Sequence, residues 1–425
     1  MTNDHSQLLL DIEKKSNIVI TKVRHVKFLK EEIEAYKDLK IGFNTLRRLF
    51  GFLKKTKPTL ATLNTLARYL EYRSYAGYLS NKLNFDAWYF QQKLLLIQQK
   101  NDLNKTDFNS INEGVQYGKN IIYVAYFVSN LILENNLRTL NSFFKKIELS
   151  KIDFSYLLQF ATIITHSFYR IDENKAIIIY NDLIKHASFK NTVPLLYIDY
   201  SNLNGIYLKV LRLIAKHSSV ISDLFFVMLM EFYRDFYTEG ICNRKEIKLP
   251  IGFSKFNPVL KGRFYAYTIM SSTAIDSNLK RKLFKECSTN RISWFLEEVI
   301  PALLIKEEYK ILKELSDQFY EEIFESKAWS DKTMSSIFLI GLANISWYNN
   351  EISSAKRSLE LVVLEKIELS YYNFISLFYY LTELKVSHAE NALETNAAAF
   401  IILKQLVLKT GFERFIGASE KYILN

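Results

Sequence analysis

Glycine and proline are scarce in this sequence, with 12 and 5 residues respectively among 425. Sheet proteins need both residues for their many tight turns, whereas helix pairs manage with short polar connections. Hydrophobic residues make up 49% of the chain and aromatic residues 15%, which excludes a disordered polymer. The composition therefore predicts an all-α protein, and the length predicts several domains or a repeat array.

Cysteine is almost absent, since Cys242 and Cys287 are the only two. This number excludes a disulfide framework or a cysteine metal cluster, and we expect both to be small, buried or half-buried side chains. The apolar runs at 121–128 and 220–230 are far shorter than the roughly 20 residues of a membrane span. The polar first residues do not resemble a signal peptide. A cytoplasmic protein without a membrane partner is expected.

Motifs for catalysis, metal binding and phosphate binding are also missing. The sequence has no GxxxxGK[ST], GxGxxG, GxSxG or HExxH motif. Its six histidines are scattered, and His166, on an apolar helix, is expected to be a hydrogen-bonded core residue. The adjacent carboxylates Glu297 and Glu298 would point apart on a helix, so we expect them on solvent-exposed faces. We therefore expect no enzyme, no catalytic residue, no metal site and no cofactor.

Positive charge is concentrated near the N-terminus. Residues 1–82 contain 16 Lys and Arg against 8 Asp and Glu, a balance of +8. The other 343 residues contain 40 and 37, a balance of +3. A basic module on a nearly neutral body predicts an anionic partner for the module. The alternative is a solvated, lysine-rich surface.

Apolar positions between residues 26 and 79 predict short helices over 27–39, 45–52 and 60–69. The first would place Phe28, Leu29, Ile33 and Tyr36 on one face. Residues from about 17 would form a helix before it.

The predicted helix ends depend on glycine, proline and short polar side chains. Gly42 is expected to take the positive φ that ends the first of these helices. Asn44 or Thr45 would cap the second, and Thr59 would cap the third directly after Pro58.

The run GFNTLRRLFGFLKKTKPTLATLNTLARYLEY, residues 42–72, resembles the second half of a Cro/repressor-type helix-turn-helix domain. In that family a short recognition helix precedes a glycine, a loop and a helix of TL..LA..L type. The resemblance covers about 65 residues and implies DNA as a partner. The turn here reads IGFN, where that family more usually has a small polar cap.

The resemblance implies which side chains contact DNA. Asn44, Thr45, Arg47 and Arg48 would face base edges in the major groove, where Arg suits guanine and Asn suits adenine. Neighbouring residues on a helix point about 100° apart, so we expect one arginine to reach a base, with Arg47 favoured. Phosphates would be contacted by the loop lysines Lys54, Lys55 and Lys57.

From about residue 112 onwards, helical segments alternate with short polar breaks. The clearest pair, residues 336–366, has Ala343 on the first helix, Asn350 at the turn, and Ala355, Leu359 and Val362 on the second. It resembles a tetratricopeptide repeat, in which small residues let paired helices approach closely. Matching positions 140, 176 and 355 are 36 and 179 residues apart, and 179 is about five periods of 36.

The sequence thus predicts a helix-turn-helix-like domain at 1–82, a connecting segment at 83–111, and an α-solenoid of tetratricopeptide-like pairs at 112–239 and 263–425. A long loop at 240–262 would separate the two halves, as a simple connection, a hinge or a ligand-contacting insert.

This architecture is similar to that of peptide-pheromone-responsive regulators, and it implies a DNA-binding transcriptional regulator and a homodimer. The body would sense a peptide or protein or mediate dimerisation. The alternative is a scaffold for protein interactions, for example in a stress or anti-phage defence assembly, with a basic docking head. An enzyme with an unfamiliar site is a third hypothesis.

Overall fold

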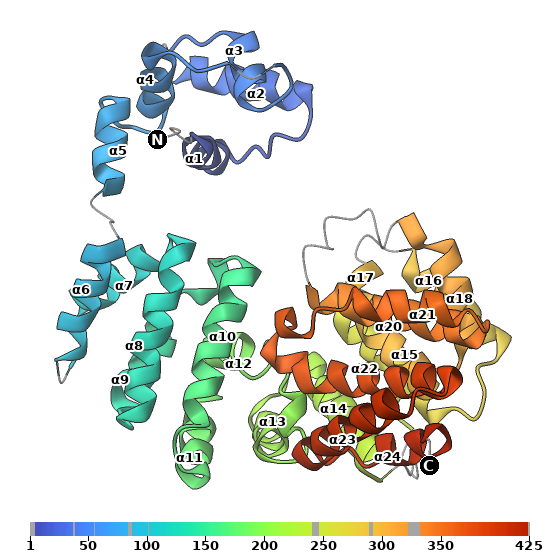
Figure 1. Ribbon diagram of the computed structural model, residues 1–425. Coiled ribbons are helices and arrows are strands. Elements are labelled where there is room, and N and C mark those ends of the chain that lie inside the picture. Colours follow the sequence, from blue (N-terminus) through green and yellow to red (C-terminus); the bar gives the residue numbers. More distant parts are fainter. Residues whose placement is uncertain are drawn as a thin grey trace. The chain divides into compact units, whose positions relative to one another are not determined.

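The computed structural model describes residues 5–36, 39–54, 56–83, 87–100, 102–239, 246–288, 292–321 and 332–423. Every regular element in these ranges is a helix, so the predicted all-α class is confirmed. The chain forms two compact units, residues 1–100 and 101–425 (Figure 1). The division falls inside the predicted connecting segment 83–111, which contains helix α6 (Ala87–Gln98) of the first unit and most of α7 (Lys105–Val115) of the second.

Five helices precede α6 in the first unit: α1 (Ser6–Ser16), α2 (Val23–Ala35), α3 (Phe43–Leu49), α4 (Leu60–Tyr69) and α5 (Tyr75–Leu83). Helix α4 has the predicted bounds, and the Thr59 side chain accepts a hydrogen bond from the Thr62 backbone, so this predicted cap is confirmed. The predicted helix 27–39 instead ends at Ala35. Tyr36 adopts an extended backbone, and its ring packs edge-on against Tyr69.

Two predicted roles around α3 are wrong. Gly42 has φ −70° and ψ 134°, and it precedes α3 as the N-cap in place of Asn44 or Thr45. The glycine with positive φ is Gly51, at 82°. The backbone N–H of Phe52 then bonds the Arg47 carbonyl at 2.8 Å, the pattern of a helix end that needs a left-handed residue.

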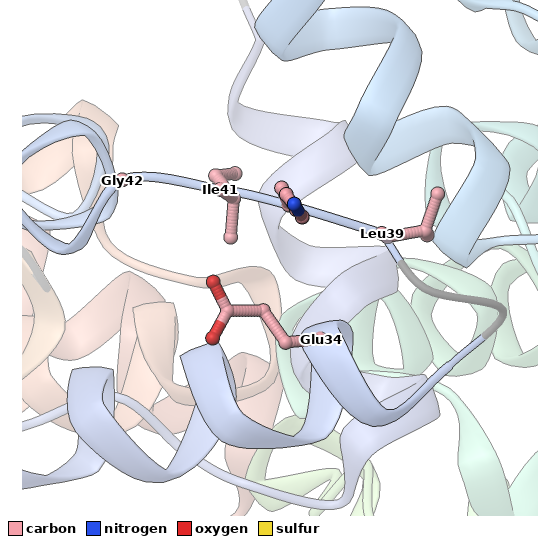
Figure 2. Close-up of a pocket in the computed structure, with 5 residues that line it drawn as sticks. Glu34, Leu39, Ile41 and Gly42 are labelled. Atoms are coloured by element: carbon pink, nitrogen blue, oxygen red, sulfur yellow. The ribbon is translucent and has the colours of Figure 1, made fainter.

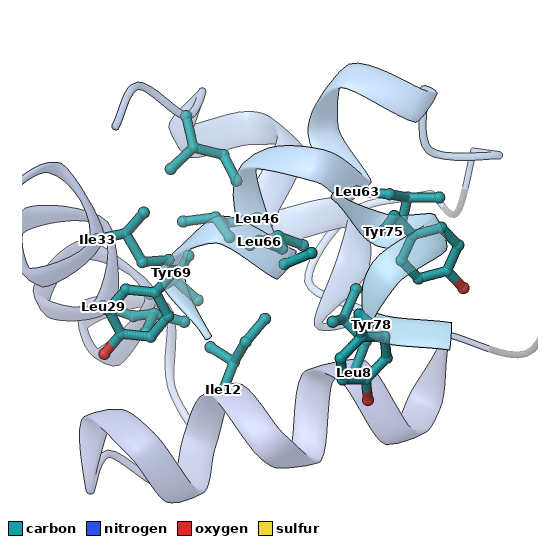
Figure 3. Close-up of a cluster of buried hydrophobic side chains, with 13 residues drawn as sticks. Leu8, Ile12, Leu29, Ile33, Leu46, Leu63, Leu66, Tyr69, Tyr75 and Tyr78 are labelled. Atoms are coloured by element: carbon teal, nitrogen blue, oxygen red, sulfur yellow. The ribbon is translucent and has the colours of Figure 1, made fainter. Parts of the chain in front are cut away.

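The core of the first unit forms where α1, α2, α3 and α4 meet. Ile12, Leu46 and Leu66 point towards one another and are fully buried (Figure 3). Leu29 and Ile33 are buried as predicted. Phe28, predicted to lie on the same face, is instead 53% exposed. The third core residue of α2 is Val26, one helical turn before Leu29.

Helices of the second unit up to the predicted loop run from α7 to α14, and α8 to α11 lie side by side (Figure 1). Those not yet given are η1 (Gly118–Asn120), α8 (Ile121–Leu133), α9 (Leu137–Lys146), η2 (Leu149–Lys151), α10 (Phe154–Phe168), α11 (Glu173–Leu183), α12 (Ala187–Thr192), η3 (Tyr200–Asn202), α13 (Ile206–His217) and α14 (Ile221–Glu239).

Helices after the predicted loop are η4 (Phe253–Lys255), α15 (Pro258–Ser271), α16 (Ser277–Cys287), α17 (Ile292–Ile305), α18 (Tyr309–Gln318), α20 (Lys332–Tyr348), α21 (Ile352–Glu360), η6 (Leu364–Lys366), α22 (Leu369–Glu390), α23 (Leu393–Thr410), α24 (Arg414–Ser419) and η7 (Glu420–Tyr422). The predicted loop 240–262 is therefore too long at its end. Asn257 caps α15 and Pro258 is its first residue, so residues 258–262 are helical.

Among the described helices of the second unit, four pairs share one turn geometry. The pairs α8/α9, α17/α18, α20/α21 and α22/α23 each turn at a left-handed residue, with φ between 56° and 62°: Asn135, Glu307, Asn350 and Asn391. In each, the next backbone N–H bonds the carbonyl five residues earlier, at 2.8–2.9 Å. This geometry stops the first helix and satisfies its last carbonyls, so the second helix starts two residues later.

The predicted pair at 336–366 is α20/α21. Its turn residue is Asn350, as predicted, and Ala343, Ala355 and Leu359 are buried. The repeat positions Leu140, Ala176 and Ala355 are fully buried on α9, α11 and α21. These predicted core positions are therefore confirmed. Val362, predicted on the second helix, is wrong in this respect, because α21 ends at Glu360 and Val362 lies beyond it, half-buried. Membership of the tetratricopeptide class stays a prediction.

Helices far apart in sequence also pack together in the second unit. The ring of Tyr200, in η3, stacks on Phe374 of α22 at 4.3 Å, and Tyr237 of α14 stacks on Phe412 and Phe415. Repeats of an open solenoid contact only their neighbours. The two predicted halves, 112–239 and 263–425, instead share a core.

Candidate nucleic-acid interface

Helix α3 is fixed to the first unit by one side and exposes the other. Leu46 is fully buried beneath it, and Phe43 and Leu49 are half-buried. Asn44 and Arg48, one turn apart, are exposed. The structure therefore places these two predicted base-reading residues on one accessible face.

Arg47 and Thr45, the other two predicted base-reading residues, are half-buried and contact their own helix or its N-cap. The Arg47 guanidinium donates a hydrogen bond to Asn44 Oδ1 at 3.3 Å and lies 5.6 Å over the Phe43 ring. Thr45 is half-buried, and its backbone N–H bonds the Gly42 carbonyl. Arg47 is thus ordered by its own helix, while Arg48 extends further into solvent.

The loop after α3 supplies the predicted phosphate contacts. Lys54 and Lys57 are exposed, and Lys55 lies outside the described residues. Two further basic side chains were missed: Lys40, before α3, and Arg68, on α4, are both exposed. The segment 39–70 contains seven Lys and Arg and not one Asp or Glu. Counting the acidic residues in that window would have identified both.

Acidic residues of the first unit lie outside that segment, and most of the described ones contact groups of their own unit. Tyr69 donates to Glu32 at 2.6 Å, and Tyr78 donates to Asp11 at 2.7 Å; the other contacts are Lys30–Glu34, Lys15–Glu71 and the Ile20 N–H to Glu13. These carboxylates have partners in their own unit, whereas Lys40, Arg48, Lys54, Lys57 and Arg68 of segment 39–70 are exposed. The excess charge of the unit is therefore concentrated around α3.

Glu34 of α2 lies beside the chain that leads into α3. Its carboxylate points towards the backbone of residues 39–42, and together they line a hollow of about 550 Å³ (Figure 2). Hydrogen bonds from Lys30 and from the Ile41 backbone N–H lower the pKa of Glu34 below its usual value. The Glu34 carboxylate therefore has a structural role: it connects α2 with the chain before α3.

The connection between α2 and α3 differs from the resemblance. Seven residues, 36–42, separate these helices. A helix-turn-helix joins its two helices by three or four residues. The chain before α3 is instead held by Ile41, which is buried in the core of the unit, and by the contact of its backbone with Glu34.

Elsewhere in the described ranges, no three His, Cys, Asp or Glu side chains are grouped as metal ligands would be. Cys287 is buried as expected, and burial raises the pKa of its thiol to about 12; Cys242 lies outside the described residues. His166 has the expected hydrogen-bond partner, Tyr197 at 3.3 Å, but it is half-buried rather than part of the core. No described helix is long and apolar enough to cross a membrane.

One expectation about charged residues is wrong. Glu298, predicted to face solvent, is 3% exposed, and its carboxylate pairs with Arg263 of α15 at 2.6 Å, which offsets the cost of burying the charge. Glu297, predicted with it, is half-buried. The hydroxyls of Tyr200 and Tyr371 also donate to it.

The chain matches no family model, no curated protein and no solved structure. The resemblances to helix-turn-helix domains and tetratricopeptide arrays therefore remain predictions.

Proposed function

We propose that this protein is a DNA-binding transcriptional regulator that contacts DNA through the exposed face of α3 and its flanking basic residues. The observation that carries the proposal is the segment 39–70, which is rich in exposed Lys and Arg and free of acidic residues. Such a surface matches a phosphate backbone, which supplies most of the affinity in protein–DNA complexes.

The position of each residue on or beside α3 suggests which part of the DNA it would contact. Arg48, with Asn44 and Arg47, would face base edges, because arginine and asparagine each make two hydrogen bonds to guanine or adenine. Thr45 would contact a base edge or sugar at the rim of this face. Lys54, Lys55 and Lys57 would contact phosphates, and Lys40 and Arg68 extend this set.

Dimerisation through α6 belongs to the same proposal. The helix buries Phe90, Leu94 and Ile97 on one side. It exposes a second apolar face made of Trp88, Tyr89, Leu95 and Leu96, each at least 55% exposed. The spacing of seven residues between 88 and 95, and between 89 and 96, is that of a helix–helix seam. Two heads joined in this way would suit a palindromic site.

The second candidate is a scaffold whose helical body binds a protein and whose basic head is a docking module. The seven-residue connection between α2 and α3 favours this reading, because it departs from DNA-binding helix-turn-helix geometry. In this case the head would bind nucleic acid weakly and without sequence preference.

The experiment compares three proteins in a selection from a random duplex pool: the wild type, Arg47→Ala/Arg48→Ala, and Arg281→Ala/Lys282→Ala. The last is a matched control, because Arg281 and Lys282 are exposed neighbours on α16 and Arg281 bonds Asn278 as Arg47 bonds Asn44. We expect wild type and control to enrich the same motif and the Arg47/Arg48 variant to lose it. Equal enrichment by all three would contradict the assigned reading helix, and no enrichment would favour the scaffold.

A further inference from the structure

The short helix η7 is held against the turn between α17 and α18. The Lys421 Nζ donates to both carboxylate oxygens of Glu307, at 2.7 and 2.9 Å, and the Tyr422 hydroxyl donates to Glu307 Oε1 at 3.2 Å. The Asn396 side chain of α23 also donates to the Tyr422 carbonyl at 2.9 Å. One carboxylate therefore binds two consecutive side chains of η7, which lie 114 and 115 positions further along the chain.

Glu307 has an unusual backbone conformation for a glutamate. It is the left-handed residue of the α17/α18 turn, with φ 58°, whereas the three turns of the same geometry use Asn135, Asn350 and Asn391. Asparagine tolerates this conformation better than glutamate, because its short polar side chain can bond the local backbone. Glutamate is therefore the less favourable residue for the turn itself, and its contact with η7 gives it a separate role.

Tyr422 covers a buried lysine. Its side chain meets the Trp347 ring edge-on, with centroids 5.6 Å apart, and the centre of its ring is 5.7 Å from the Lys385 Nζ. That amine donates to the Tyr309 hydroxyl at 2.7 Å and to Asn344 Oδ1 at 2.9 Å. Helix η7 therefore forms one wall of the site that separates the amine from water.

Lys385 and Lys421 depend on the same carboxylate. Burial lowers the pKa of Lys385 to about 7; Glu307 opposes this effect and Lys421 adds to it. Burial would raise the pKa of Glu307, but its contacts with Lys421 and then Lys385 hold it below its usual value. While η7 is in place, Glu307 is bound to Lys421, so a charge on Lys385 is disfavoured. When η7 leaves, water and Glu307 become available to Lys385.

Other ionisable groups surround the site. The pKa values of Tyr309 and Tyr422 are raised, by burial first and then by Glu307, so both hydroxyls stay neutral near neutral pH. Tyr348 packs against Tyr309, with ring centroids 5.3 Å apart. His388 packs against Tyr422, with centroids 6.2 Å apart, and it can also gain a proton. An experiment on Lys385 therefore needs a variant of His388 as a control.

We propose that η7 is a latch, which Glu307 closes over Lys385 and which opens when Lys385 takes up a proton. The open form exposes Lys385, which then regains its ordinary pKa of 10.5. Between about pH 10.5 and about pH 7 the open form thus binds a proton that the closed form lacks, so falling pH favours opening. Below about pH 7 both forms are protonated, and this effect becomes constant. The proposal does not depend on DNA binding, because all these residues lie in the second unit.

The test is limited proteolysis of the full chain by trypsin between pH 7 and pH 9, followed by mass spectrometry. Cleavage after Lys421 reports the opening of η7. Cleavage after Lys190, which is 8% exposed, reports unfolding of the unit as a whole. A peptide with the sequence of residues 415–425 measures the activity of trypsin at each pH. Far-ultraviolet circular dichroism and thermal melting check that each variant is folded.

We expect cleavage after Lys421 in the wild type to precede cleavage after Lys190. Relative to the peptide, its rate should rise about tenfold or more as the pH falls from 9 to 7. Lys385→Met has no proton to gain and should lose this pH dependence, whereas His388→Gln should keep it.

Glu307→Gln should be cleaved faster after Lys421 at both pH values, because the latch loses its ion pair. The control is Glu173→Gln, which removes the exposed Glu173–Lys209 pair and should be cleaved like the wild type. Glu307 is exposed, so this variant tests the latch even where Lys385→Met does not fold.

Four results would each overturn the proposal. Lys385→Met could keep the pH dependence of the wild type, or His388→Gln could abolish it. Glu307→Gln could be cleaved no faster than Glu173→Gln. Cleavage after Lys421 could fail to precede cleavage after Lys190, which would mean that η7 does not open separately.

Discussion

Lys385 is a lysine buried in the core, where its amine has an altered pKa. It is 2% exposed on α22, and its Nζ donates to Tyr309 Oη at 2.7 Å and Asn344 Oδ1 at 2.9 Å. The rings of Tyr309, Trp347 and Tyr422 surround the amine. Burial lowers the pKa of Lys385 to about 7; nearby Glu307 opposes this effect and Lys421 adds to it. The folded protein therefore favours the neutral amine near neutral pH.

Stability is expected to rise with pH because of Lys385. Between about pH 7 and 10.5 the unfolded chain binds a proton at this lysine that the folded chain lacks. The free energy of unfolding should therefore increase across this window, by up to about 5 kcal/mol, with no contribution to the slope below or above it. Urea unfolding at about pH 7 and about pH 9.5, on the wild type and Lys385→Met, measures the difference. Parallel pH dependences in the two proteins would contradict the buried amine.

Residues of this kind could not be identified from sequence. Lys385, Glu298 and Glu34 are ordinary charged residues of amphipathic helices until distant elements pack on them. Their partners are Tyr309 and Asn344, Arg263, and the Ile41 backbone, respectively. The side chains of α3 were predictable because they depend on a local pattern, and Asn44 and Arg48 are exposed as that pattern requires.

At the scale of elements, sequence predicts best where a helix end depends on its own residues. Thr59 caps α4 and Asn350 turns α20 into α21, both as predicted, because capping and left-handed turns need only neighbouring residues. The end of α2 and the start of α3 were misplaced. These positions depend on Tyr36 packing on Tyr69 and on Glu34 holding Ile41, contacts that no local pattern shows.

At position 350, in the α20/α21 turn, glycine should preserve the stability of the protein and alanine should lower it. Asn350 has φ 62°, a conformation that costs residues with a Cβ roughly 1–2 kcal/mol unless the side chain is Asn or Asp. Asn350→Ala is expected to lower the free energy of unfolding by about 1 kcal/mol, and Asn350→Gly to leave it nearly unchanged. Asn349→Ala, at the exposed preceding position, is the control for chemical denaturation. Alanine and glycine at position 350 with equal stability would contradict the turn.

Helix α21 offers a matched pair of leucines for testing its packing. Leu359 is 5% exposed and Leu361, just beyond the last turn, is 61% exposed. Leu359→Ala should lower the free energy of unfolding by roughly 2–5 kcal/mol, because it leaves a cavity in the core. Leu361→Ala should change it by less than about 0.5 kcal/mol. Similar losses for both variants in urea unfolding would mean that the buried face of α21 is assigned wrongly.

At the scale of the whole molecule, the sequence predicted a basic head and a helical body but not how the body is closed. The helix pairs depend on periodicity, which is local in sequence. The contacts of Tyr200 with Phe374, and of Tyr237 with Phe412 and Phe415, join residues more than 170 positions apart. No spacing in the sequence indicates these contacts.

The most direct measurement of the central claim is the salt dependence of DNA binding by the full chain. Each phosphate contact contributes about 0.9 to the slope of log affinity against log salt concentration. We predict a steep slope for the wild type and for the Arg281→Ala/Lys282→Ala control. In Lys54→Ala/Lys57→Ala the slope should be shallower by about 1.8, since two phosphate contacts are lost. A slope unchanged by the Lys54/Lys57 variant, or close to zero in the wild type, would contradict DNA binding by the basic segment around α3.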